Sequence, residues 1–168
     1  MTEHEPDQSQ PELIDAAKNW LAMDGLWFLA VEEMFGMDAA LQCDKRVWEQ
    51  FAPSEARRIM KRCGITGHGG LDALKNALEN RMYRFINPQR VSRPDDNTLI
   101  LSVGTCHVQA ARRRKNLPPF HCKEIGQTEY STFARTVDPR IRTECITAPP
   151  ESAGKDCACS WKFTLETI

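Results

Sequence analysis

Hydrophobic positions recur at helical spacing through the first half of the chain. Apolar residues at steps of three and four predict amphipathic helices over 11–22, 37–51, 53–63 and 71–85. Between the first two, residues 25–35 are apolar nearly all round and carry the pair Glu32-Glu33 near their end, which predicts a largely buried helix covered on several sides.

Strand-like runs and two shorter helices fill the second half. A strand over 90–93, a turn over 94–97 and the β-rich run 98–103 predict a hairpin, while 141–147 and 158–165 predict two further strands. Helices are expected over 106–115 and 123–136, the latter with an inner face of Ile125, Gly126, Glu129 and Phe133. The pattern favours an α+β fold, in which an N-terminal helical layer packs on a small antiparallel β-sheet with two further helices.

Composition limits the number of domains and the kinds of partner. A chain of 168 residues with 41% hydrophobic and 27% charged residues predicts a single domain over 11–168, with a helical part over 11–87 and a cysteine-bearing sheet part over 88–168. Residues 1–10 predict a disordered acidic tail. The net charge of −1 argues against a nucleic acid partner, and the short apolar runs argue against a membrane partner. The polar, acidic N-terminus is unlike a signal peptide, so a cytoplasmic location is expected.

Five of the seven cysteines lie in the last third of the chain, together with two histidines. Cys106 and Cys122 each open a predicted helix, where free N–H groups and the helix dipole favour a thiolate. Cys145 and Cys159 are expected on paired strands. As a group these residues predict a metal site assembled by the fold, although single cysteines also serve as small buried hydrophobes.

A second candidate site lies in the apolar helix. Trp27, Phe28 and Glu32 are candidates for a pocket that faces the cysteines, and the alternative is plain core with a solvated acidic face. A buried carboxylate needs a partner, and Arg112 is the residue we expect to pair with Glu32 and orient a polar ligand. The alternative for the basic run 112–115 is stabilisation of a helix C-terminus.

Segments covering nearly the whole chain after residue 12 resemble the bacterial family related to L-2-amino-thiazoline-4-carboxylic acid hydrolase. They are 27–36 (WFLAVEEMFG), 44–48 (DKRVW), 106–112 (CHVQAAR), 120–123 (FHCK), 129–134 (EYSTFA), 138–141 (DPRI) and 159–163 (CSWKF). The cysteine-bearing part also resembles the four-vinyl-reductase domain, a small-molecule-binding module that shares its fold with haem-nitric-oxide-binding and Golgi-tethering subunits. The second resemblance implies zinc held by Cys106, Cys122, Cys145 and Cys159, with Cys157 or a histidine as the alternative for one ligand.

Three functions follow as expectations. The first is a zinc-binding, small-molecule-binding domain of the bacterial cytoplasm, with a small, anionic organic ligand. The second is a metal-dependent hydrolase that opens a cyclic C–N bond, with Glu129 or Glu144 as general base and His107 or His121 as ligand or proton shuttle. The third is an interaction protein with a structural zinc. A homodimer is compatible with each of them.

Overall fold

The fold is known from a computed structural model that describes residues 10–152 and 157–166, so the expected acidic tail lies outside the described residues except for Gln10. Its elements are α1 (Pro11–Phe35), α2 (Met37–Cys63), α3 (Gly70–Glu79), the 3-10 turn η1 (Met82–Phe85), β1 (Gln89–Asp95), β2 (Thr98–Val103), α4 (His107–Arg114), α5 (Lys123–Val137), β3 (Ile141–Thr147) and β4 (Cys159–Leu165). The predicted α+β class is confirmed. Among the described helices, none combines the length and the apolar character needed to cross a membrane.

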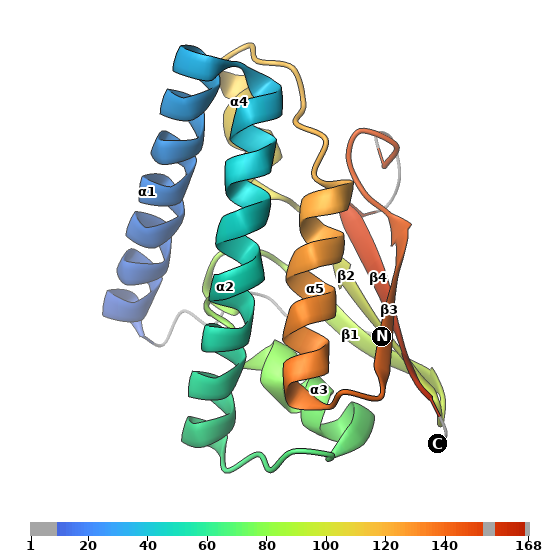
Figure 1. The fold of residues 1–168 in the computed structure, drawn as a ribbon. Helices are drawn as coiled ribbons and strands as arrows, with labels where there is room; N and C mark the ends of the chain where they lie inside the picture. Colours follow the sequence, from blue (N-terminus) through green and yellow to red (C-terminus); the bar gives the residue numbers. More distant parts are fainter. Residues whose placement is uncertain (1–9, 153–156, 167–168) are drawn as a thin grey trace.

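The four strands form one antiparallel sheet in the order β1-β2-β4-β3. The last strand of the chain is therefore central, pairing with β2 on one side and β3 on the other. Helix α5 covers the sheet, α2 lies beside α5, and α1 is the outermost helix of the layer (Figure 1). The alternation of β2, in which Leu99, Leu101 and Val103 are buried, directs one face of the sheet toward α5.

The first half contains fewer and longer helices than the sequence predicts. Helix α1 runs through Gly25 without a break, and α2 runs through Pro53 although proline offers no N–H to the carbonyl one turn earlier. Packing explains the continuity of α2, because Trp48, Ala52 and Ala56 around the proline are all buried. Burial of a helix face therefore outweighs the local cost of a helix-breaking residue.

The predicted helix over 71–85 is wrong in its second half. Helix α3 ends at Glu79, and Arg81 adopts an extended backbone before the 3-10 turn η1 begins. This break turns the side chain of Arg81 into the core, where it is 2% exposed. A continuous helix would have given that side chain a different direction.

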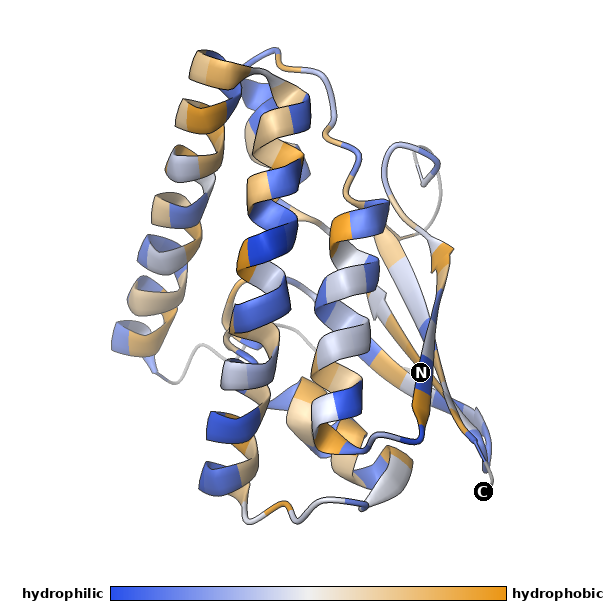
Figure 2. Cartoon of the chain, in the orientation of Figure 1, coloured by the Kyte–Doolittle hydropathy of each residue, from blue (hydrophilic) through white to orange (hydrophobic). Residues whose placement is uncertain are grey.

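Helix α1 is not covered on several sides, contrary to the expectation for an all-round apolar helix. Trp27 is 68% exposed, and Met23 and Met34 are exposed as well. Hydrophobic residues follow one another along α1, which lies at the outer edge of the helical layer (Figure 2). Only one face of an edge helix can be packed, and in α1 Ile14 and Ala17 mark that buried face.

The second half agrees closely with its prediction. Helix α5 begins directly after Cys122, and its expected inner face is buried. Gly126 on that face lies under the indole ring of Trp161, and a Cβ at this position would come within 2.4 Å of the ring. Glycine is therefore required there for α5 to approach β4.

Candidate functional site

A cavity of about 470 Å³ lies among α1, α2, α4, α5 and the central strand β4. Its walls are mostly apolar. Phe28 and Leu29 of α1 form one side, and Phe120, Ile125 and Trp161 form the other. The rings of Phe28 and Phe120 meet with their centroids 5.2 Å apart.

Three carboxylates line the part of the cavity near α2. Burial raises the pKa of Glu129 to about 7, although the neighbouring Arg81 opposes the shift. Burial also raises the pKa of Asp44 to about 7, with a smaller contribution from the negative charges of Asp24 and Glu129. The pKa of Asp24 is raised by burial too. This region therefore carries groups that change protonation near neutral pH.

Cationic side chains line the cavity between α1 and α4. Lys18 and Arg114 are exposed at this rim, and neither has an ion-pair partner among the residues that the structure describes. His107 lies near both, and partial burial together with their positive charges lowers its pKa. Its Nδ1 lies 2.8 Å from Oδ1 of Asn87. This rim favours an anionic group on a bound molecule.

The predicted pair of Glu32 and Arg112 is confirmed. The guanidinium of Arg112, 4% exposed, donates from Nη1 and Nη2 to the two carboxylate oxygens at 2.6 and 2.9 Å. Its Nε donates to the carbonyl oxygen of Pro118 at 2.7 Å. The hydrogen bonds that Arg112 donates to Glu32 lower the pKa of the Glu32 carboxyl group. The pair ties α1 to α4, and Arg112 lines the cavity whereas Glu32 does not.

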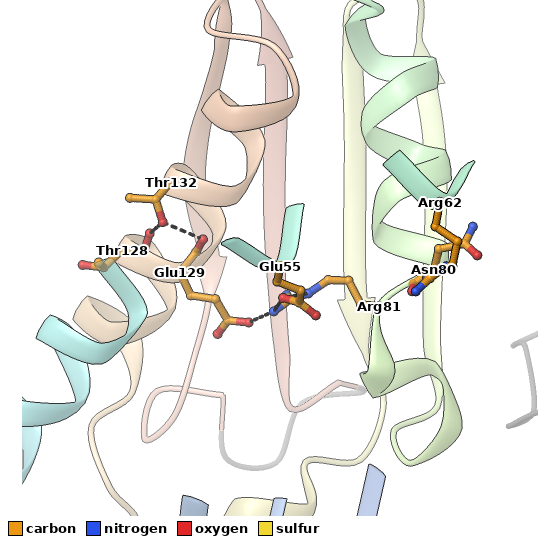
Figure 3. A network of polar contacts seen from close by, with 7 residues as sticks. All are labelled: Glu55, Arg62, Asn80, Arg81, Thr128, Glu129 and Thr132. Carbon is orange, nitrogen blue, oxygen red and sulfur yellow. Dashed lines mark hydrogen bonds and ion pairs between the residues drawn. The ribbon is translucent and has the colours of Figure 1, made fainter. Parts of the chain in front are cut away.

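A buried ionic cluster around Arg81 supports the carboxylate region (Figure 3). Nη2 of Arg81 lies 2.8 Å from Oε2 of Glu55 and 2.7 Å from Oε1 of Glu129. Aromatic rings surround the guanidinium, with centroids 4.8 to 5.8 Å away: Trp48, Tyr83, Tyr130 and Phe133. The sequence did not reveal this cluster, because the expected helix over 71–85 hid the break that directs Arg81 inward.

Three of the four predicted cysteine ligands line the cavity. They are Cys106, Cys122 and Cys159, whereas Cys145 on β3 packs against the core outside it. Burial raises the pKa of Cys106, so the expectation that its helix position favours a thiolate is outweighed, and burial raises the pKa of Cys122 to about 12. The pKa of Cys159 is raised for the same reason.

The geometry gives the zinc prediction no added support. Within residues 10–152 and 157–166, no three His, Cys, Asp or Glu side chains are grouped in a way that could hold a metal ion. Zinc remains a prediction from the sequence, to be tested by metal analysis of the purified protein.

Two further candidates lie away from the cavity. Trp27 points to solvent on the outer face of α1, one residue from the cavity-lining Phe28. Glu144 lies on β3 and contacts Arg142 at 3.3 Å and Lys162 at 3.6 Å, outside the lining of the cavity. Of the general bases considered, only Glu129 reaches the cavity. His121, the other histidine considered, is exposed in the loop before α5 and does not line the cavity.

Comparison with known proteins gives a family and a fold. The chain belongs to a family of unknown function (DUF6125), which matches residues 5–165. No curated protein matches it. A crystal structure of trafficking protein particle complex subunit 3 from Naegleria fowleri, covalently bound to palmitic acid, is similar at 11% identity over 95% of this chain and 98% of that chain, with a TM-score of 0.53. At this identity the likeness shows a shared fold.

Proposed function

We propose that this member of the DUF6125 family binds an amphiphilic small molecule, with an apolar tail in the cavity and an anionic group at its cationic rim. The observation that carries the proposal is the apolar cavity of about 470 Å³, which is within the size range of small-molecule sites, about 300–1,000 Å³. The catalytic and zinc-dependent alternatives have no comparable observation in their favour.

The walls of the cavity favour a tail over a compact polar ligand. Phe28, Leu29, Phe120 and Ile125 offer apolar surface, and the nearby carboxylates have pKa values raised by burial, so they are easily neutralised. Burying apolar surface contributes about 0.8 kcal/mol per methylene group. A chain of several methylenes would therefore gain substantial binding free energy here.

The rim supports an anionic head group. Lys18 and Arg114 are cations without ion-pair partners in the described part of the chain, and both border the cavity. A carboxylate or phosphate placed between them would gain two charge-assisted contacts. The palmitic acid bound covalently to the similar trafficking subunit supports a long apolar chain as the ligand, but not the anionic group.

Binding of saturated fatty acids of increasing length tests the proposal. Affinity should rise about fourfold for each added methylene, since about 0.8 kcal/mol corresponds to that factor, until the cavity is full. Titration calorimetry or native mass spectrometry would measure this series. Affinities that do not depend on chain length would contradict the proposal.

Leu29→Trp and Ala30→Trp form a matched pair of variants. Leu29 lines the cavity, whereas Ala30 is the next residue of α1 and is exposed outside it. Leu29→Trp should fill the cavity and lower fatty-acid affinity at least tenfold, and Ala30→Trp should leave it unchanged. Equal effects of the two variants would place the binding site elsewhere.

A charge-reversal variant tests the role of the cationic rim. Arg114→Glu should weaken fatty-acid binding but not the binding of the matching alcohol, because only the acid carries a charge. Lys75→Glu, an exposed site on α3, should weaken neither.

A further inference from the structure

Cys106 lies between two cavities. Besides the large apolar cavity, its side chain lines a second cavity of about 290 Å³, next to Gln109 and Arg113. Of the described residues, Cys106 alone appears in the lining of both. A molecule with one part in each cavity would therefore pass the thiol.

The surroundings of Cys106 suit a reaction at sulfur. The residue is the N-cap of α4, and although its side chain makes no capping hydrogen bond, the backbone N–H groups of Val108 and Gln109 are close enough to interact with its sulfur. Such N–H groups stabilise negative charge on sulfur and on an oxygen that forms beside it. The apolar surroundings raise the pKa of Cys106, so the thiol is protonated at rest.

The second cavity has polar groups that are not used within the protein. Nε2 of Gln109 donates to the carbonyl oxygen of Phe120 at 2.8 Å, which leaves the buried Oε1 without a hydrogen-bond partner in the described part of the chain. Arg113 is exposed beside it, and no ion pair of Arg113 is found among the described residues. An occupant with amide N–H groups and a phosphate would satisfy both side chains.

An unsatisfied donor also faces the large cavity. Trp161 lines it, is 1% exposed, and has an indole N–H that makes no hydrogen bond to the described residues. The thiol of Cys159 is near enough to interact with this N–H, but outside hydrogen-bond geometry. A buried donor without a partner is rare in a protein interior and is consistent with a polar atom on a bound molecule.

We propose that Cys106 accepts an acyl group from an acyl thioester of the pantetheine type, with the acyl chain in the large cavity and the pantetheine arm in the second. This inference rests on the proposed binding of an apolar chain. It adds the class of molecule that delivers the acyl chain to Cys106. The sulfur of Cys106 attacks the thioester carbonyl carbon and forms a new C–S bond. The C–S bond to the donor breaks, and the donor leaves as a thiol that carries the proton lost by Cys106.

The other cavity thiols are poorer acceptors for geometric reasons. Cys122 and Cys159 line only the large cavity, and Cys157 lines only the second, so a thioester carbonyl placed where the two cavities meet would lie beside none of the three. Cys122 and Cys159 would instead contact the acyl chain, and Cys157 would contact the donor arm. Cys43 is exposed on α2 and lines neither cavity, although the next residue, Asp44, lines the large one, so Cys43 serves as the control thiol.

Incubation with palmitoyl-coenzyme A, followed by intact-mass measurement, tests this inference. The full chain should gain one palmitoyl group, which neutral hydroxylamine removes because the bond is a thioester. Cys106→Ser should lose at least nine-tenths of the modification, while Cys43→Ser should be modified like the parent protein. Modification that persists in Cys106→Ser, or no modification of the parent protein, would overturn the proposal.

Palmitate binding to Cys106→Ser separates this inference from the proposed function. If Cys106→Ser binds palmitate with parent affinity and the parent is not acylated, the acylation proposal fails and the binding proposal stands. If neither protein binds palmitate, the binding proposal fails as well. Arg113→Glu should also slow acylation by palmitoyl-coenzyme A severalfold. It should not slow acylation by the palmitoyl thioester of N-acetylcysteamine, which lacks phosphate. If the variant slows acylation by both donors equally, Arg113 does not contact the donor.

Discussion

Replacement of Arg81 by methionine should destabilise the protein strongly. Its guanidinium is 2% exposed and lies 2.8 Å from Glu55 and 2.7 Å from Glu129, so the substitution leaves two buried carboxylates without their cation. Removing one partner from a buried ion pair costs about 3–5 kcal/mol. For a chain of this size we expect the melting temperature to fall by roughly 6–20 °C, at roughly 2–4 °C per kcal/mol.

Variants of Glu55 and Glu129 test whether unpaired negative charges cause the loss of stability in Arg81→Met. Glu55→Gln and Glu129→Gln, added to Arg81→Met, remove the unpaired charges while keeping similar volumes, so the triple variant should regain most of the lost stability. Urea denaturation followed by circular dichroism at neutral pH would measure the three free energies of unfolding. A loss below 1 kcal/mol in Arg81→Met, or a triple variant no more stable than Arg81→Met, would refute the reasoning.

Three further results are expected. Gly126→Ala should cost about 1–3 kcal/mol, because its Cβ would meet an indole ring at 2.4 Å, and thermal denaturation would detect it. Glu32→Gln should weaken ligand binding more than it lowers stability, because it removes the charge that holds Arg112 at the cavity wall. Ligand titration and denaturation of the same variant would measure both effects. If the role of Glu32 is purely structural, the loss of stability should be the larger of the two. The pKa of Glu129 is raised from 4.5 to about 7 and that of Asp44 from 3.8 to about 7, so the folded state keeps protons that the unfolded state releases. Their contribution to stability is complete below about pH 4 and is lost as the pH rises to about 7, and Asp44→Asn with Glu129→Gln should flatten this part of the stability profile.

The sheet and α5 were predictable because their signals are local. Alternating apolar residues define β2, and Cys122 marks the start of α5 after a proline-rich loop. The lengths of α1 and α2 were not predictable in this way. Gly25 and Pro53 look like helix ends in the sequence. Burial of Trp48, Ala52 and Ala56 keeps α2 continuous through Pro53, whereas α1 continues through Gly25 although its neighbours Met23 and Leu26 are exposed.

The candidate site was predictable in part. The pairing of Glu32 with Arg112 followed from the rule that a buried carboxylate needs a partner, and the structure confirms it. The position of Trp27 did not follow, because an apolar pattern alone does not say how many sides of a helix are covered. The Arg81 cluster depends on one backbone break after α3, which residue spacing does not reveal.

The most direct test of the cavity as a binding site is a crystal structure of the protein grown with palmitate. The proposal predicts electron density for the chain between α1 and α5, in contact with Phe28 and Phe120, and for its carboxylate near Lys18 and Arg114. Density for palmitate only on the exposed outer face of α1, or an unoccupied cavity at saturating palmitate, would contradict it.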